Sequence, residues 1–253
     1  MMKVLAITQA RYGSTRFPGK VLRTINGMSL LEIHLRRIQK SQLIDKIKVA
    51  TTVEPESIEI KKIAGSVNIE SFRGSIENVL ERFYHTALPE SPDWVVRLTS
   101  DCPLIDPVLI DKIIQFAVDL DLDYASNTLT PSYPDGLDVE VFKYNALKRA
   151  YNEAKLKSEL EHVTPYIWKN SSFNGGKLFS SDVVKNSIDY SNIRITVDTY
   201  EDFQVIEKLI KMEGFDSPWI NYVKLLEDNK DVRILNKMFL RNEGYQQSLN
   251  EEK

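Results

Sequence analysis

The sequence contains a single cysteine, Cys102, among its 253 residues. An internal disulfide framework and a metal site built from several cysteines are therefore excluded. The sequence also lacks an apolar run near the roughly 18 residues that a membrane helix requires. Its first residues lack the basic, apolar and cleavage-site pattern of a signal peptide. We therefore expect a cytoplasmic protein that is not inserted in a membrane.

The chain has no strong excess of charge of either sign. Its formal net charge is -3, which predicts no general attraction to nucleic acid or to an anionic membrane surface. Hydrophobic residues make up 42% of the chain and charged residues 27%, as is typical of a globular protein with a substantial core. A cluster of basic residues on such a chain indicates a small anionic ligand rather than a polymer.

Short apolar runs alternate with helical patterns over the first half of the chain. Strands are predicted at 3–9, 46–52 and 93–100, and helices at 29–41, 55–64, 75–87 and 106–120. Ser29, Ser75 and Asp106 stand where helix N-caps are expected, and Pro107 takes the first helical position. This alternation predicts a Rossmann-like, mostly parallel sheet with helices on both faces.

The second half of the chain is less regular. Strands are predicted at 122–127, 136–144 and 193–197, and helices at 144–156, 199–212 and from about 216 onward, with a frayed end at 248–253. No internal repeat or linker interrupts the sequence. We therefore expect one α/β domain over 1–253, in which about 127–190 forms a small inserted β-rich subregion for substrate or dimer contacts.

The segment ARYGSTRFPGK, residues 10–20, follows the first predicted strand directly. Five residues separate its two glycines and Lys20 precedes a valine, so the segment is not a P-loop, and the G-x-G-x-x-G pattern of dinucleotide sites is absent. Arg11 and Arg16 offer forked donors for phosphate oxygens, and Lys20 offers a point charge. Gly13 permits close approach of the backbone. The alternative is a solvated surface loop with incidental charges.

Two aspartates follow predicted strands at their carboxyl ends. Asp101 comes after the strand at 93–100, and Asp198 after the strand at 193–197. Ligands of open α/β sheets bind beyond these ends, and Mg²⁺ favours a few carboxylates together with phosphate and water oxygens. The pair could therefore share a Mg²⁺ ion that also binds a nucleotide. A helix cap or a turn would account for either aspartate alone, and for Asp198 in particular.

Together these segments resemble the cytidylyltransferases that make CMP-activated sugar acids, which include the CMP-Kdo and CMP-sialate synthetases. The residues that carry the resemblance are ARYGSTRFPGK, RLTSDCPLIDP and VDTYEDF. The blocks FRGS with VLERF, DGLDVEVF and EHVTPYI are similar to those of the spore-coat polysaccharide biosynthesis protein F subfamily. The resemblance covers residues 3 to 210 and implies the nucleotide-diphospho-sugar transferase fold.

The resemblance also implies roles for particular residues. The nucleotide would be bound by Ala10, Arg11, Gly13, Ser14, Arg16, Lys20, Arg73, Ser75 and Ser100, with Arg11, Lys20 and Asp101 acting in catalysis. Asp101 and Asp198 would hold Mg²⁺, and Asp138, Glu140 and His162 would face the sugar acid. Thr99-Ser100 replace the Gln-Gly pair of Kdo synthetases. The expected partners are CTP, a sugar acid and a second copy of the chain in a homodimer.

Several alternatives remain open from the sequence. Asp138 and Glu140 would lie on a solvated face if their strand were at an edge of the sheet, and a lone His162 is also typical of a structural residue. The same chemistry with another nucleotide and a sugar phosphate is the nearest rival. A glycosyltransferase would need a D-x-D motif after a strand, whereas DLDLD at 119–123 falls at a helix end. A non-catalytic nucleotide-binding protein is the third rival.

Overall fold

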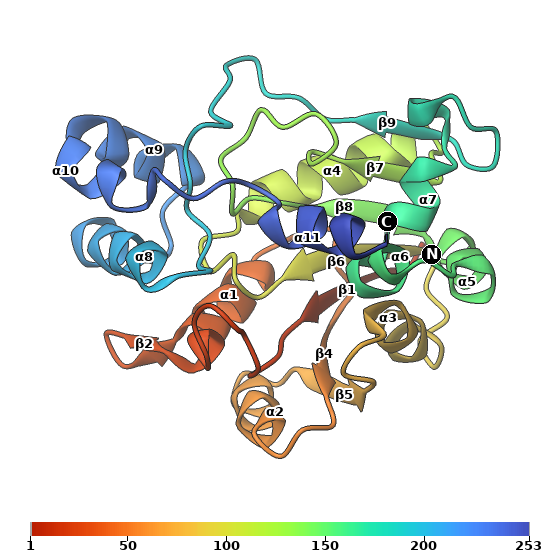
Figure 1. Cartoon of the computed structure of the whole chain (residues 1–253), viewed down its shortest axis with the longest axis horizontal. Coiled ribbons are helices and arrows are strands. Elements are labelled where there is room, and N and C mark those ends of the chain that lie inside the picture. Colours follow the sequence, from red (N-terminus) through yellow and green to blue (C-terminus); the bar gives the residue numbers. More distant parts are fainter. Residues whose placement is uncertain (1, 253) are drawn as a thin grey trace.

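The computed structural model describes residues 2–252 and is built around a seven-stranded sheet. The strand order is β5-β4-β1-β6-β8-β7-β9, from the bottom to the top of Figure 1. These strands are β1 (Val4–Gln9), β4 (Lys46–Thr52), β5 (Glu70–Gly74), β6 (Trp94–Thr99), β7 (Tyr124–Ser126), β8 (Glu140–Lys143) and β9 (Ser181–Val183). A separate two-stranded sheet pairs β2 (Thr24–Ile25) with β3 (Met28–Ser29).

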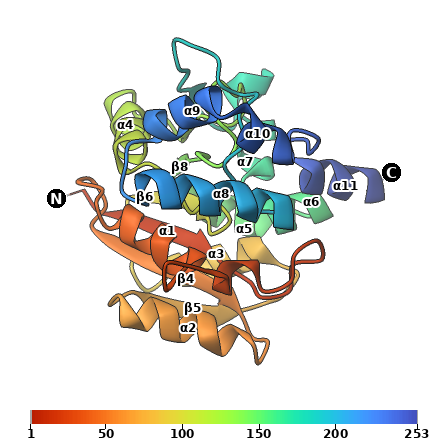
Figure 2. The ribbon, with the colours of Figure 1, turned by 90° about the vertical axis from the view of Figure 1, so that its left-hand side faces the viewer.

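Helices cover both faces of the large sheet. They are α1 (Leu30–Ile38), α2 (Ser57–Ser66), α3 (Val79–Ala87), α4 (Pro107–Asp119), α5 (Tyr144–Glu153), α6 (Lys157–His162), α7 (Pro165–Lys169), α8 (Tyr200–Glu213), α9 (Trp219–Asp228), α10 (Lys230–Arg233) and α11 (Glu243–Glu251). One apolar core lies under α1, α2, α4, α8 and α9, and a second lies under α3, α5 and α7. Figure 2 shows this layered arrangement from the side.

Most neighbouring strands run parallel, as the alternation of strands and helices predicts. β1 pairs in parallel with β4 and β6, and β4 pairs in parallel with β5. β8 is antiparallel to both β6 and β7, and β9 is parallel to β7. The carboxyl ends of β1, β4, β5 and β6 therefore meet at one edge of the sheet, where α/β proteins bind their ligands. The predicted fold class is confirmed.

Two local predictions are wrong. Residues 193–197 form no strand, and a single bridge joins Arg194 to Asp135. Their apolar side chains alternate because Ile193, Ile195 and Val197 reach the core while the backbone runs past the loop before β8. The N-cap of α3 is Asn78, whose side chain accepts from the Glu81 amide. Ser75 instead accepts from the Asn78 amide one turn earlier.

The segment 127–190 does not make a sheet of its own. It adds β8 and β9 to the central sheet and contributes α5, α6 and α7. Its role in substrate or dimer contacts, and the single-domain division, stay predictions. The chain end that was predicted to fray is helical as far as Glu251, and the last turn of α11 contacts α6. Lys253 lies outside the described residues.

Within residues 2–252, no helix has the combination of length and apolar character that a membrane crossing requires.

Candidate active site

Lys20 lies at the carboxyl-terminal edge of the sheet and joins two carboxylates that are distant in sequence. Its Nζ donates to Asp101 Oδ2 at 3.1 Å, to Asp198 Oδ1 at 2.7 Å and to the Val197 carbonyl at 2.7 Å. Asp101 follows β6, and Asp198 precedes α8. The structure therefore brings together the three residues on which the predicted polyphosphate and metal site depends.

The turn that directs Lys20 toward this edge requires a glycine. Gly19 has φ 67°, and its amide donates to the Tyr12 carbonyl at 3.0 Å. A Cβ at this position would lie 3.0 Å from the Tyr12 ring and would hold a backbone conformation that side chains disfavour. The glycine thus closes the loop 10–19 on itself, and Lys20 begins the short helix that follows.

The ion pairs of Lys20 keep its ammonium and Asp101 charged. Burial lowers the pKa of Lys20, but the attraction of Asp101 and then of Asp198 outweighs it and leaves the pKa above its ordinary value. Burial likewise raises the pKa of Asp101, but Lys20 outweighs that effect and holds it well below its usual range. The site therefore presents an ionised carboxylate beside a protonated amine at neutral pH.

Asp198 is held in place by a buried network that the sequence analysis did not identify. Arg194 donates to Asp198 Oδ2 at 3.1 Å, to Asp202 Oδ1 at 2.8 Å and to Asp135 Oδ2 at 2.6 Å. Asp202, which is fully buried, also accepts from the Asp198 amide at 2.9 Å. The four-residue spacing of Arg194, Asp198 and Asp202 is the signal that could have revealed this network.

The two aspartates are free of the capping roles that would have explained them without a ligand. Thr199 caps α8 and Asp106 caps α4, as predicted for Asp106. Because Asp101 and Asp198 accept from the same Nζ, both lie within reach of one cation. Among residues 2–252, no group of three or more His, Cys, Asp and Glu side chains is placed to hold a metal. Two carboxylates suit Mg²⁺ when substrate phosphates and water complete its ligands.

The loop between β1 and Lys20 places its basic side chains next to these carboxylates. Arg16 contacts Asp198 Oδ2 at 3.1 Å and Glu243 Oε2 at 2.5 Å, and its side chain remains 38% exposed. Arg11 and Gly13 are exposed. Ser14 Oγ accepts a hydrogen bond from the Phe17 amide at 3.5 Å. Ala10 is buried, and its amide donates to the Ala50 carbonyl. Arg11 is thus available to an anion, whereas Arg16 is already paired with two carboxylates.

The three other residues assigned to the nucleotide have structural partners. Arg73 donates to the carbonyls of Thr52, Val53 and Glu54, at the carboxyl end of β4. Ser75 stabilises the turn before α3, and Ser100 is buried with its amide on the Gln9 carbonyl. Their contacts with a base or ribose stay predictions.

Glu140 does not lie on a solvated face. β8 is an inner strand, and the Glu140 side chain is buried. Its Oε1 accepts from the Tyr124 hydroxyl at 2.7 Å and from the Thr164 hydroxyl at 2.5 Å, while Oε2 pairs with Arg97. Every carboxylate oxygen is therefore satisfied within the protein.

Asp138 and His162 lie beside the C-terminal segment. Asp138 pairs with Arg241, although burial, reinforced by the nearby Glu140, leaves the pKa of Asp138 above its ordinary value. His162 Nε2 lies 3.0 Å from Ser248 Oγ, and burial together with Arg97 lowers the pKa of His162 to about 4. His162 is therefore neutral at pH 7. The role of these residues toward a sugar acid stays a prediction.

The acidic stretch at 119–123 forms ion pairs and hydrogen bonds with residues outside this site. Asp121 and Asp123 pair with Lys143 at 2.8 and 3.4 Å, and Asp123 also accepts from the Ser180 amide. Cys102 is buried, and burial raises the pKa of its thiol above the usual value. The stretch thus stabilises a turn, and the thiol is a packing residue as expected.

Comparison with known proteins identifies the family. A profile described as cytidylyltransferase matches residues 5–243. The chain belongs to the cytidylyltransferase family. It is 37% identical over 237 residues to an uncharacterized protein of Methanocaldococcus jannaschii, covering 93% of this chain and 95% of that one. It is 33% identical over 240 residues to the spore coat polysaccharide biosynthesis protein SpsF of Bacillus subtilis, covering 92% and 97%.

Solved cytidylyltransferases share the architecture. A cytidylyltransferase from Leptospira borgpetersenii superposes with a TM-score of 0.87 at 27% identity, over 95% of this chain and 100% of the other. A CMP:2-keto-3-deoxy-manno-octonic acid synthetase complexed with CTP superposes with a TM-score of 0.63 at 17% identity, over 83% and 99%. At that identity the second match concerns the fold alone. The predicted family resemblance is confirmed.

Proposed function

We propose that this cytidylyltransferase transfers CMP from CTP to the hydroxyl of a 2-keto-3-deoxy sugar acid, with release of pyrophosphate. The observation that carries this proposal is the convergence of Asp101, Asp198 and Lys20 beside an arginine-containing loop, in a chain of this family. The relatives that carry a specific description act on such acids or serve polysaccharide synthesis. A nonulosonate or a Kdo-type acid is the acceptor we expect.

The chain's own residues would bind and orient the reactants. The acceptor oxygen bonds to the α-phosphorus, the bond from that phosphorus to the bridging oxygen of the β-phosphate breaks, and the hydroxyl proton is released. Arg11, Arg16 and Lys20 would stabilise the charge that develops on the leaving pyrophosphate. Because all three protons of Lys20 are already donated to oxygens, a phosphate oxygen must replace one of its present acceptors.

Asp101 and Asp198 would hold Mg²⁺ if the enzyme uses it. When bound, the ion would neutralise phosphate charge and help to orient the acceptor. Arg194 and Asp202 fix the direction of Asp198, so this carboxylate is preorganised before a cation arrives. The donor set therefore fits the ion that the sequence leads us to expect.

A panel of nucleotides and acceptors tests this function. Pyrophosphate release is measured with CTP, UTP, ATP and GTP, each with Kdo, its 8-amino analogue and N-acetylneuraminate, and with a sugar 1-phosphate. We expect release with CTP and one of the acids. Release only with another nucleotide and the sugar phosphate would overturn the choice of substrates. No release in any pairing, together with no binding of CTP, would favour a non-catalytic protein.

A further inference from the structure

Arg97 is a cation near the predicted acceptor residues that the sequence analysis assigned to nothing. It lies on β6 two residues before the carboxyl end of the strand, in register with Glu140 of β8. Its guanidinium pairs with Glu140 Oε2, and its side chain is 14% exposed. Its Nε is buried and has no hydrogen-bond partner among residues 2–252. Such a donor can bond to an acceptor that a ligand or water supplies, and the Nε atoms of Arg82 and Arg241 share this state in the part of the chain that the structure describes.

Arg97 could bind a ligand while the Glu140 side chain keeps its position. The Tyr124 and Thr164 hydroxyls already hold the other oxygen of that carboxylate. Glu140 therefore acts as a fixed support that orients the guanidinium. His162 is neutral at pH 7, in part because Arg97 lies near it. The permanent positive charge on this side of the site thus comes from arginines, namely Arg97 and Arg241, which pairs with Asp138.

We propose that Arg97 binds the carboxylate of the acceptor, and that Glu140 is its positioning residue. This inference rests on the proposed function, because it requires an acceptor that carries an acid group. The forked donors of arginine match a planar carboxylate, and the cations of the loop 10–20 would be engaged by the triphosphate. Arg97 would then separate the two anions of the reaction, and it would favour acids over neutral sugars.

Kinetics with paired acceptors test the assignment. We compare Arg97→Met, Arg97→Lys and the double variant Arg97→Met/Glu140→Gln with wild type, using the acid that turns over and its methyl ester. The double variant removes both buried charges, so it guards against misfolding from an unpaired Glu140. We expect the KM for the acid to rise about tenfold or more in each variant. The KM for CTP and for the methyl ester should stay unchanged.

The outcomes separate this inference from the proposed function. If wild type turns over the acid, and the variants keep its KM or change the KM for CTP equally, the role of Arg97 is wrong while the function stands. If wild type releases no pyrophosphate with any acid, the function and the role of Arg97 both fall. Arg149→Met serves as the matched control, because Arg149 pairs on the surface with Glu153 within α5.

A separate set of contacts concerns the C-terminal segment 240–252. Its helix α11 lies beside α6 in both views (Figures 1 and 2), and the segment passes in front of the central sheet in Figure 1. Arg241 pairs with Asp138, Glu243 with Arg16, and Ser248 with His162 and Glu161. The segment thus engages three of the residues that were predicted to bind substrates.

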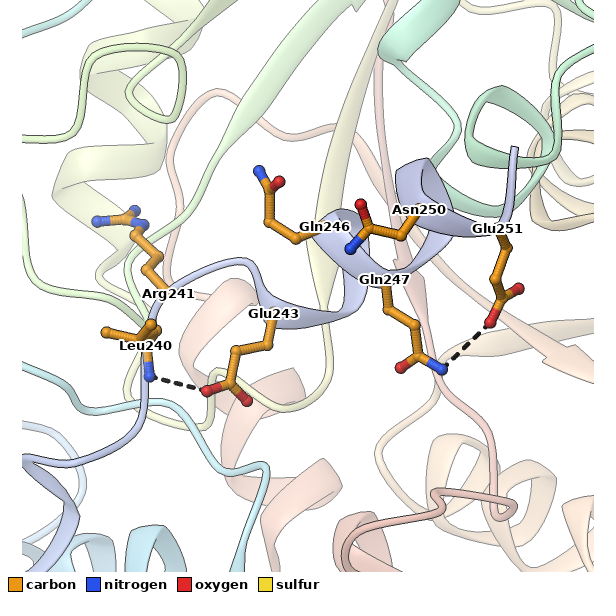
Figure 3. A pocket seen from close by; sticks show the side chains of 7 residues that line it. All are labelled: Leu240, Arg241, Glu243, Gln246, Gln247, Asn250 and Glu251. Atoms are coloured by element: carbon orange, nitrogen blue, oxygen red, sulfur yellow. Dashed lines mark hydrogen bonds between the residues drawn. The ribbon is translucent and has the colours of Figure 1, made fainter. Parts of the chain in front are cut away.

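This segment is attached by polar contacts and by Tyr245, whose ring lies 5.2 Å from the His162 ring and 6.0 Å from the Trp168 ring, centroid to centroid. Ser248 is its one residue that is buried. On the face of α11 opposite Ser248, a hollow of about 430 Å³ is lined by Glu243, Gln246, Gln247, Asn250 and Glu251, together with Leu240 and Arg241 from the preceding loop (Figure 3). Few apolar contacts and exposed ion pairs give little stability to such an attachment. The segment can therefore leave the site without disturbing the two cores.

We infer that Glu243 is a built-in competitor for the polyphosphate. Its carboxylate occupies the Arg16 guanidinium, while its other oxygen accepts from the Leu240 amide at 3.0 Å. A phosphate group that binds Arg16 at Nη1 must displace it, so nucleotide binding there and release of α11 are coupled. This inference also rests on the proposed role of Arg16.

Calorimetry with inorganic triphosphate and with CTP tests the competition. Glu243→Gln should bind both ligands about two- to fivefold more tightly than wild type, because an exposed ion pair of this kind is weak. Glu59→Gln, which removes an exposed pairing with Lys62 within α2, is the control and should leave the affinity unchanged. In wild type, amide hydrogen exchange within 243–251 should quicken when triphosphate is added.

An unchanged or weaker affinity of Glu243→Gln would overturn the inference, as would slower exchange in α11 on binding, because a segment that closes over the ligand gives these results. If wild type binds neither CTP nor triphosphate, the proposed nucleotide site itself is wrong. Competition by Glu243, closure of α11 over the ligand and the absence of a nucleotide site therefore give different results.

Discussion

At the scale of single residues, His34 connects the core to the loop that carries Asp101. It is fully buried, with Nδ1 2.8 Å from the Cys102 carbonyl and Nε2 2.8 Å from the Thr8 hydroxyl. A carbonyl can only accept, so Nδ1 carries the proton and Nε2 accepts from Thr8. His34 thus fixes the backbone next to Asp101, a role that its place inside an amphipathic helix did not reveal.

Because burial lowers the pKa of His34 to about 4, the stability of the fold should depend on pH. The unfolded chain has a histidine pKa of about 6.5, so the contribution is complete above that value and is lost as pH falls toward 4. The loss should reach about 3 kcal/mol in the free energy of unfolding. Denaturant unfolding from pH 7.5 to 4.5 measures it. An equal pH slope in His34→Gln would contradict this account.

Prediction of single residues from the sequence succeeded where a short motif contains the charged side chains that the site uses. Lys20, Asp101 and Asp198 were predicted together, although 178 positions separate the first from the last. Arg97, Arg241 and Glu243 were missed because their partners lie on other elements, and no local pattern indicates such pairings. Arg194 was missed although its four-residue spacing from Asp198 is a local signal. The alternation of apolar and acidic residues predicted a strand that contains Glu140. It did not predict that Glu140 is buried, because burial depends on β8 being an inner strand of the sheet.

At the scale of elements, the loop before β8 must press closely on the segment 193–197. Gly136 has φ 110°, and a Cβ there would lie 2.6 Å from the Ile195 carbonyl carbon. The Asp135 amide donates to the Ile193 carbonyl at 2.9 Å, and the Ile195 amide donates to the Asp135 carbonyl at 2.7 Å. This contact places Asp135 and Asp138 near the network that holds Asp198.

Gly136→Ala should therefore destabilise the protein by at least about 2 kcal/mol, from backbone strain and the displaced neighbours together. Gly175→Ala is the matched control. Gly175 has φ 76° with no atom within 4 Å of an added Cβ, so its substitution should cost about 1 kcal/mol. Denaturant unfolding of both variants gives the comparison. Equal losses at the two positions would show that the close approach does not matter.

The same contact explains why the predicted strand at 193–197 was wrong. Alternating burial is normally produced by a sheet with one buried face. Here it arises because Ile193, Ile195 and Val197 face the core while Arg194 reaches three carboxylates. Periodicity reports which side chains are buried, and it does not report which backbone groups are paired. β5 was missed for a related reason, since its half-buried residues show no apolar run.

At the scale of the whole molecule, two apolar cores lie on opposite faces of one sheet. Strands β1 and β6 contribute side chains to both cores, so neither core can be lost while the other persists. We expect one cooperative unfolding transition, with fluorescence and far-UV circular dichroism giving coincident curves. Two separated transitions would show that the chain contains independent domains. Light scattering on the same sample tests the expected homodimer.

The fold class was predictable because alternating strands and helices permit few architectures. The position of the C-terminal segment was not, since polar contacts such as Arg16 with Glu243 leave no apolar pattern in the sequence. The structure of the whole molecule therefore reveals three features of the site that the sequence motifs do not contain. Arg194 supports Asp198, Arg97 lies beside Glu140, and the polar segment 240–252 contacts the site.

The central claim is that Asp101 and Asp198 bind a cation together with the triphosphate of CTP. Calorimetric titration of CTP with and without Mg²⁺ tests it most directly, in wild type, Asp101→Asn, Asp198→Asn and the exposed control Asp231→Asn. We predict that Mg²⁺ tightens CTP binding in wild type and in the control, and that both site variants lose most of this gain while keeping the fold. An equal effect of Mg²⁺ in all four proteins would contradict the account.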